Sequence, residues 1–186
     1  MSELERFGEA SPPVPARAKM KYDVPSYTQG DLSLCWAFCE VMIYDYNQGT
    51  HFGQENATAQ AIALAKSRAI FGDWNRGRKA RNRGKAVPVQ NIHELYTLLR
   101  DQNGPLYARY TGVAATDGSD VAHLVVITGV NLATNSVYTN NPWGRGNNGT
   151  LGGKYSQTFE EFLSDVAWDG GPHGYEFNGV TIHLIK

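Results

Sequence analysis

The hydrophobic pattern of the chain changes from a helical period to a strand period after residue 104, and this change constrains the fold more than any other feature. Three segments before it are typical of helices: residues 33–46, 55–72 and 89–104. Four shorter segments after it are typical of strands: residues 106–112, 122–131, 136–140 and 179–186. The order predicts an α+β fold, with an N-terminal helical lobe and a C-terminal antiparallel β-sheet lobe.

The first helical segment has apolar side chains around most of its surface, which predicts a largely buried helix. Asp31 and Ser33 are its N-cap candidates, and Gly49 is placed to end it. Gly72 and Gly104 follow the second and third helical segments in the same way. The sequence therefore predicts where each of these helices stops.

Two local signals add detail to the second half of the chain. The stretch "NLATNS" separates two strand segments and predicts a hairpin connection. Thr158 and Glu161 have the spacing of a capping box, which predicts a short helix over "TFEEFLSDV".

The length of 186 residues suits one domain. Residues 1–20 are polar and contain three prolines, so we expect a flexible N-terminal arm and a single domain over residues 21–186. The arm lacks the apolar stretch of a secretory signal peptide, and no apolar run is long enough to cross a bilayer. We expect a soluble protein, cytoplasmic or secreted without a cleavable signal peptide.

Residues 66–85 form a strongly basic segment. Eight Lys and Arg side chains stand there against Asp73 alone, a charge of +7, so the rest of the chain carries −8 for a net charge of −1. Such a cluster can bind nucleic acid or an anionic surface. No nucleic-acid-binding motif accompanies it, so we favour a solvated loop and expect neither nucleic acid nor a membrane as a partner.

Cys35 and Cys39 lie four positions apart in the first helical segment. Both side chains lean the same way along the helix, so we expect no disulfide between them. A helix that begins near Ser33 places Cys35 in its first turn, where free N–H groups and the helix dipole stabilise an anion. Since the thiolate is the nucleophilic form of cysteine, Cys35 is a candidate nucleophile. Ordinary core packing is the alternative.

A candidate base and its orienting group lie on neighbouring strand segments. His123 begins "HLVVITGV", where a strand would hold its imidazole rigidly. Asn141 lies in "TNNPWG", across the predicted hairpin, where its side-chain oxygen can accept the imidazole N–H. Asn140 competes for this role but should face the opposite side of its strand. Trp143 can lie over the His–Asn hydrogen bond and keep water from it.

Gln29 lies six positions before Cys35 in "QGDLSLCWAF". Acyl transfer needs hydrogen-bond donors where the carbonyl oxygen becomes negative. The Gln29 amide and the backbone N–H of Cys35 are suitable donors, so Gln29 is a candidate oxyanion-hole residue.

These three segments together resemble the papain-like cysteine peptidase superfamily. "QGDLSLCWAF" is similar to its active-site segment, "HLVVITGV" to its base-bearing strand, and "NPWG" to its Asn-x-Trp-Gly motif. They occur in the papain order. Their compact spacing is more similar to small bacterial members, such as plant-pathogen effector proteases and bacteriocin-leader peptidases, than to lysosomal cathepsins.

The resemblance implies a papain-like fold and a cysteine endopeptidase without cofactor or metal, acting on a protein or peptide substrate. A bacterial effector or toxin of this kind would also meet a host or immunity-protein partner. The stretch "DLSL" carries no cysteine for an active-site disulfide, and many bacterial relatives carry Asp where Asn141 stands. The resemblance assigns catalysis to Cys35, His123 and Asn141, the oxyanion hole to Gln29, and supporting roles to Trp36 and Trp143.

Two other classes of function stay open at this point. The same triad can act on other amides, as in a deamidase, a peptidoglycan amidase or a transamidating toxin. A non-catalytic binding domain that uses the basic segment 66–85 is the third hypothesis. A retired site has no physical reason to keep all four candidate residues together, which weighs against this third class.

The remaining motifs favour structural roles. His51 and His93 are expected at the surface, and packing or capping suffices for His173 and His183. The chain has no CxxC pair and no HExxH motif, so a zinc site is not expected. "GRGNNG" matches the dinucleotide fingerprint, but the residues after it cannot open a helix, so we expect a flexible loop.

Overall fold

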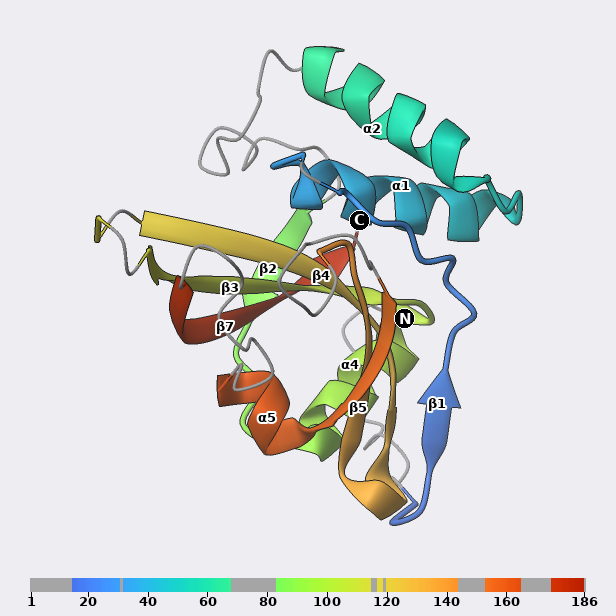
Figure 1. The fold of residues 1–186 in the computed structure, drawn as a ribbon. Coiled ribbons are helices and arrows are strands. Elements are labelled where there is room, and N and C mark those ends of the chain that lie inside the picture. The colour runs from blue at the N-terminus through green and yellow to red at the C-terminus, as the bar shows by residue number, and fades with distance from the viewer. Residues whose placement is uncertain are drawn as a thin grey trace, which may run out of the picture.

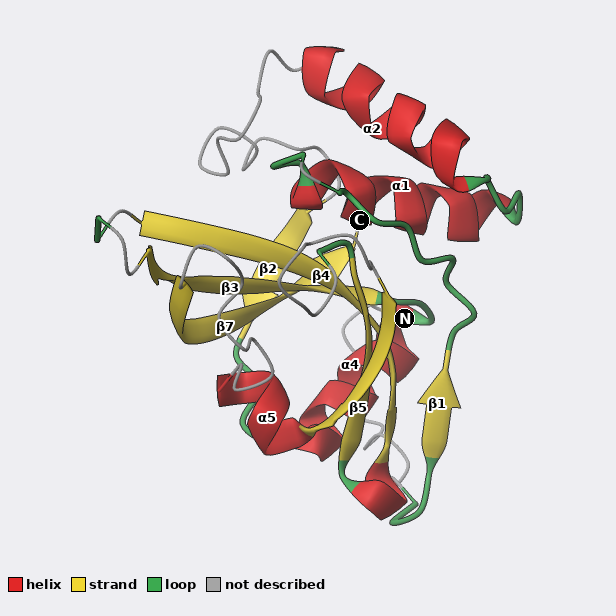
Figure 2. Ribbon diagram, in the orientation of Figure 1, coloured by secondary structure: helices red, strands yellow, loops and turns green. Residues whose placement is uncertain are grey.

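Helices cover both faces of one antiparallel sheet in this protein (Figures 1 and 2). The computed structural model describes residues 15–30, 32–67, 83–114, 117–118, 120–143, 153–164 and 175–185. Helices α1 (Cys35–Gln48) and α2 (Gln54–Ser67) lie on one face, and α4 (Ile92–Gln102) and α5 (Phe159–Ser164) on the other. The arrangement confirms the α+β prediction and is papain-like.

The seven-stranded sheet has the order β2-β7-β3-β4-β5-β6, and every recorded pairing is antiparallel. Strand β1 lies off this path, because it pairs with the end of β4 beyond the residues that pair with β3. The strands are β1 (Lys19–Lys21), β2 (Arg83–Val87), β3 (Leu106–Ala114), β4 (Asp120–Asn131), β5 (Ser136–Asn141), β6 (Gly153–Thr158) and β7 (Tyr175–Ile185).

Strand β4 is buried on both faces, which explains its nearly continuous apolar sequence. Leu124 and Val126 belong to the core cluster with α1 and α2. Val125 and Ile127 belong to the cluster with α4 and α5. The alternation of side chains along one strand therefore joins the two cores.

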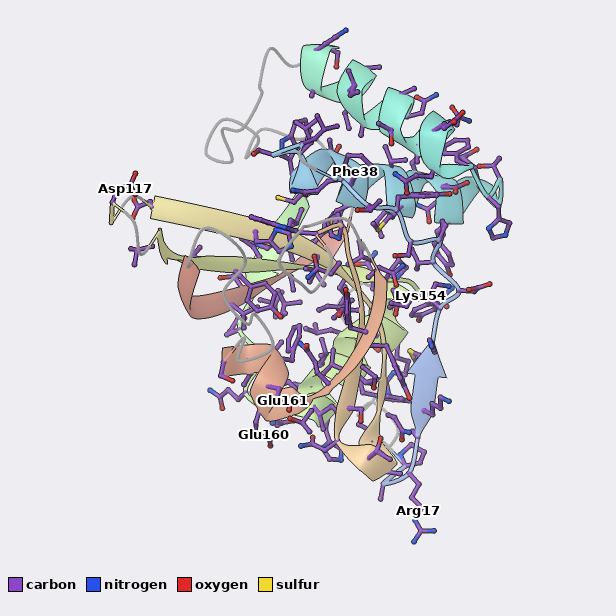
Figure 3. The ribbon with its side chains drawn as sticks, in the orientation of Figure 1. Arg17, Phe38, Asp117, Lys154, Glu160 and Glu161 are labelled. Carbon is purple, nitrogen blue, oxygen red and sulfur yellow. The ribbon has the colours of Figure 1, made fainter. Side chains whose placement is uncertain are left out.

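Helix α1 is buried around most of its circumference, as its apolar sequence predicts. Phe38 lies on this helix (Figure 3) and is fully buried in the core with α2 and the sheet. The expected N-caps were wrong: the helix begins at Cys35, and Leu34 occupies the N-cap position without a side-chain hydrogen bond. The main chain turns there instead, with Leu34 N–H donating to Leu32 O at 2.8 Å. Asp31 lies outside the described residues.

Of the other predicted helix ends, the stop of α1 at Gly49 and the capping box of α5 are confirmed, and α4 ends one residue earlier than predicted. Gly49 adopts the left-handed conformation at the end of α1, with φ of 64°. At the end of α4 this position is taken by Asn103, with Gly104 following. The predicted capping box of α5 forms between Thr158 and Glu161, the latter labelled in Figure 3. The end predicted at Gly72 lies outside the described residues.

The four predicted strands and the hairpin are present, with β4 and β5 joined through a 3-10 turn over Leu132–Thr134. Three strands were not predicted. Strand β2 lies at the end of the basic segment, where a loop was expected, and pairs with β7. Strand β6 pairs with β5 shortly after the "GRGNNG" stretch, and β1 is short. Residues 68–82 and 144–152 lie outside the described chain.

The boundary between the expected arm and the domain, placed at residue 20, stays a prediction. Lys19 and Met20 already pair with Asn131 and Val130 of β4, so the sheet includes the last residues of that arm. Residues 1–14 lie outside the described chain.

Candidate active site

Cys35 is the first residue of α1 and is partly exposed, whereas Cys39 one turn later is fully buried. The first turn of α1 contains no acidic side chain. The positive end of the helix dipole therefore acts on Cys35 without a competing negative charge in that turn. The partial exposure of Cys35 and its place at the positive end of the helix dipole both favour the thiolate form.

His123 lies near the start of β4 and is 2 % exposed. Its Nε2 atom lies 2.8 Å from Oδ1 of Asn141, the last residue of β5. Val126 of β4 pairs with Asn140 of β5, so Asn141 lies opposite Val125. Side chains alternate along a strand, so Val125 and His123 point to the same face of the sheet, and Asn141 points to that face too. The strand register thus brings the two side chains together.

Asn141 Oδ1 accepts a second hydrogen bond, from the backbone N–H of Trp143 at 2.9 Å. A backbone N–H can only donate, so this atom of Asn141 must be the amide oxygen. His123 Nε2 must therefore carry a hydrogen toward it, which leaves Nδ1 of the neutral imidazole as a proton acceptor. The hydrogen-bond pattern defines the tautomer that a general base needs.

The indole of Trp143 packs edge-on to the imidazole of His123, with ring centroids 5.9 Å apart. Burial lowers the pKa of His123 to about 4, although the hydrogen bond to Asn141 acts in the opposite direction. The imidazole is therefore neutral near neutral pH in the absence of a neighbouring anion.

Helix α1 packs directly on the strand that carries His123. The Cys39 thiol donates a hydrogen bond of 3.2 Å to the backbone oxygen of Leu124, the residue after His123. Cys35 lies one helical turn before Cys39, and it packs with Ala122 against the same core cluster. The fold therefore brings the cysteine end of α1 close to the start of β4.

Gln29 is buried, with 6 % exposure, in the segment that leads to α1. Its backbone N–H donates to the carbonyl oxygen of Pro142 at 2.8 Å, next to Asn141. Its side-chain Oε1 is buried and accepts no hydrogen bond from the described residues. The Nε2 group of the same side chain is the part that can donate a hydrogen bond.

Asn140 points to the other side of β5. Its Nδ2 atom donates to the backbone oxygens of Val24 at 2.9 Å and Pro25 at 3.0 Å. These bonds hold the segment that precedes Gln29 against the sheet. The two neighbouring asparagines therefore contact different parts of the site.

The remaining candidates take other positions in the fold or lie outside the described chain. Trp36 is 1 % exposed and packs in the core of α1 and α2. His51 and His93 are exposed, as expected, and His183 lies in β7. His173 and the "GRGNNG" stretch are not described. The described residues contain no group of three or more His, Cys, Asp or Glu arranged for a metal ion.

Sequence reasoning missed the residues that hold the Gln29 segment in place. Gln54 bonds both backbone groups of Thr28, and Tyr27 donates a hydrogen bond to the buried carboxylate of Asp45. Gln54 follows Thr28 by 26 positions and has no motif around it. A contact between a loop and the first residue of a distant helix leaves no periodic signal in a sequence, so no pattern could have identified it.

A helix that begins with a cysteine, packed against a sheet that holds a His–Asn pair, defines the class of papain-like cysteine peptidases. The chain belongs to the family described as papain-like cysteine protease AvrRpt2, which matches residues 18–164. The protein is therefore a cysteine peptidase, a hydrolase with protein substrates. A search of curated proteins finds no match to this chain. No helix in the described part of the chain has the length and apolar content to span a membrane.

Proposed function

We propose that this peptidase cleaves internal peptide bonds through Cys35 as nucleophile, His123 as general base and acid, and Asn141 as the orienting residue. The observation that carries the proposal is the hydrogen bond of 2.8 Å between His123 Nε2 and Asn141 Oδ1. It leaves Nδ1 as the proton acceptor of an imidazole held on β4, the strand against which α1 packs.

The reaction follows from these positions. Nδ1 of His123 takes the thiol proton of Cys35, and the sulfur forms a bond to the peptide carbonyl carbon. The imidazolium then protonates the leaving amine, the C–N bond breaks, and an acyl-enzyme remains. His123 next removes a proton from water, whose oxygen attacks the thioester carbonyl carbon. The C–S bond then breaks, the carboxylic acid is released, and the imidazolium returns its proton to sulfur.

The negative charge on the carbonyl oxygen is held by two donors, the Gln29 side chain and the backbone N–H of Cys35. Both belong to one short segment whose position is set before substrate binds, and preorganised donors are the most effective kind. Trp143 supports the pair through its ring contact with His123. Trp36 supports it indirectly, by anchoring the start of α1 in the core.

Active-site labelling tests the assignment. An epoxysuccinyl peptide should add once to the wild type, as measured by intact mass, and not at all to Cys35→Ala. Cys39→Ala is the matched control, since Cys39 lies on the same helix but is fully buried, and it should label normally. Labelling should slow strongly in His123→Ala. An adduct that persists in Cys35→Ala would show that another residue is the nucleophile.

We further propose that the protein acts as a bacterial effector on a host protein, which rests on its family membership. Comparison of new N-termini in host and bacterial lysates, with wild type against Cys35→Ala, identifies the substrate. Cleavage confined to the bacterial lysate would contradict the effector role. Loss of ammonia from glutamine side chains, or release of muropeptide fragments without new protein N-termini, would instead support a deamidase or amidase.

A further inference from the structure

The backbone of Thr28 and Gln29 is hydrogen-bonded at every polar group. Gln29 N–H donates to Pro142 O at 2.8 Å, and Gln29 O accepts from Leu32 N–H at 3.1 Å. Both backbone groups of Thr28 are bonded to the side chain of Gln54. A segment that is bonded in this way cannot shift without losing several hydrogen bonds together.

The side-chain amide of Gln54 acts on Thr28 as a neighbouring β-strand would. Its Oε1 accepts from Thr28 N–H at 3.0 Å, and its Nε2 donates to Thr28 O at 2.7 Å. The second hydrogen of Nε2 goes to the hydroxyl of Thr58 at 3.1 Å. Every donor of this amide is therefore in use, and its orientation is fixed by Thr28 N–H, which can only donate.

The need for such support is visible on the other side of Gln29. Gly30 has a φ of 55°, in the left-handed region, and glycine gives a chain more freedom than any other residue. The chain therefore turns sharply at Gly30, immediately after Gln29. The hydrogen bond to Pro142 restrains Gln29 directly, and the bonded backbone of Thr28 restrains the chain just before it.

We propose that Gln54, at the start of α2, is a positioning residue for acyl transfer: by bonding both backbone groups of Thr28 it sets the place of the Gln29 side chain. This inference rests on the proposed role of Gln29 in the oxyanion hole. An oxyanion donor acts at hydrogen-bond distance, so a shift of a few tenths of an ångström weakens it in the transition state more than it affects the thiol.

The test compares two reactions of the same thiol. Release of p-nitrophenol from the p-nitrophenyl ester of a blocked glycine requires acyl transfer and an oxyanion. Alkylation of Cys35 by iodoacetamide requires the thiolate but forms no oxyanion. Gln54→Ala should lower kcat/KM for the ester roughly tenfold, mostly through kcat, and should leave the alkylation rate unchanged within about twofold.

Two variants control for structural damage. Gln60→Ala removes an exposed glutamine from the same helix and should leave both reactions unchanged. Gln54→Glu keeps the acceptor for Thr28 N–H but faces Thr28 O with a carboxylate, so it should not restore the ester reaction. Equal losses in both reactions for Gln54→Ala would mean that Gln54 serves only to hold the fold, and would overturn the inference.

A double-mutant cycle separates failure of this inference from failure of the proposed function. Gln29→Ala should slow ester turnover about a hundredfold, and adding Gln54→Ala should slow it no further. Full activity of Gln29→Ala, or no ester turnover by the wild type, would contradict the proposed acyl-transfer site itself. A large effect of Gln29→Ala with additive or absent effects of Gln54→Ala would contradict the positioning role alone.

Discussion

At the residue scale, Asn140 and Asn141 carry the same amide to opposite faces of β5, and their contacts differ in kind. Asn141 bonds the imidazole of His123, whereas Asn140 bonds two backbone oxygens in the segment before Gln29. Both are buried. Asn141 contacts a side chain of the proposed triad, whereas Asn140 contacts only backbone. We therefore expect a substitution of Asn141 to affect mainly activity and a substitution of Asn140 to affect mainly stability.

We expect Asn141→Ala to lower kcat/KM on the order of a hundredfold, since the imidazole loses its orienting partner. Asn140→Ala should lower the free energy of unfolding by about 2 kcal/mol, because the oxygens of Val24 and Pro25 lose their common donor. Urea unfolding and ester turnover of both variants measure this. A larger loss of turnover in Asn140→Ala than in Asn141→Ala would reverse the assignment.

The buried imidazole of His123 should also make stability depend on pH. Burial lowers its pKa in the folded protein to about 4, below the ordinary value of 6.5. As the pH falls from 6.5 toward 4, the unfolded chain binds a proton that the folded protein does not, so the free energy of unfolding decreases. The stabilisation is complete above pH 6.5 and amounts to about 2 kcal/mol between pH 7.5 and pH 5.

His123→Gln should remove this part of the pH dependence, and His93→Gln, at an exposed position, should keep it. Urea unfolding of the three proteins at pH 7.5 and pH 5 measures the difference. An identical pH dependence in the wild type and His123→Gln would show that the pKa of His123 is close to its ordinary value.

At the element scale, the backbone of β1 lies so close to Gly129 of β4 that a side chain at this position would not fit. A Cβ atom there would lie 2.1 Å from Met20 O and 2.7 Å from Lys21 Cα. Both are backbone atoms, so a rotamer change cannot relieve the contact. The pairing of β4 with β5 shifts register next to this position, between Ile127 and Gly129.

Gly129→Ala should therefore displace β1 and lower the free energy of unfolding by about 2–4 kcal/mol. Gly53→Ala is the control, because a Cβ there meets no atom within 4 Å and the backbone is not left-handed. Denaturant unfolding of both variants provides the measurement. A Gly129→Ala protein as stable as the wild type would mean that β1 does not hold this place on β4.

Asp45, near the end of α1, joins this helix to the segment before Gln29 and to the loop that follows the helix. Its carboxylate is 1 % exposed and accepts from the Tyr27 hydroxyl, the Thr50 hydroxyl and the Phe52 N–H. Burial alone would raise the pKa of Asp45, but these hydrogen bonds outweigh it and the pKa is lowered. Through Tyr27 the carboxylate fixes the chain two residues before Gln29.

Asp45→Ala should cost about 3 kcal/mol of unfolding free energy, because buried donors lose their acceptor. Asp101→Ala removes an exposed partner of Arg100 instead and should cost less than about 1 kcal/mol. Thermal and urea unfolding compare them. Equal, small losses in the two variants would show that water replaces Asp45 at little cost.

At the scale of the whole molecule, the two cores share the strands β3 and β4. Tyr107 and Val126 face the helices that carry Cys35 and Gln54, while Ala108 and Ile127 face α4 and α5. Neither helix layer has a sheet of its own to pack on. Loss of either core should therefore unfold the sheet, and with it the site on the strand ends.

Leu99→Ala in α4 should cost about 2–5 kcal/mol. It should also lower the midpoint seen by tryptophan fluorescence, a signal to which Trp36 in the opposite core contributes. Fluorescence and far-ultraviolet circular dichroism should give coincident transitions in both proteins. A fluorescence midpoint that stays at the wild-type value in Leu99→Ala would mean that the two layers unfold separately.

Periodic and local signals explain what could be predicted. Helix α1, the β4–β5 hairpin and the capping box of α5 each depend on spacings within a few residues, and the sequence contains them in full. Strands β1, β2 and β6 escaped prediction because they are short or carry Gly and Lys. Such segments become strands only through backbone bonds to a neighbouring strand.

The sequence by itself determined the α+β class, the order of the candidate residues Gln29, Cys35, His123 and Asn141, and the chemistry that their side chains allow. The tertiary structure decided which atoms meet: the oxygen of Asn141 on Nε2 of His123, and the amide of Gln54 on the backbone of Thr28. The physical reason is range. Helix periods and turns act between near neighbours, whereas these contacts join residues 18 and 26 positions apart, and packing against the shared sheet sets their distances.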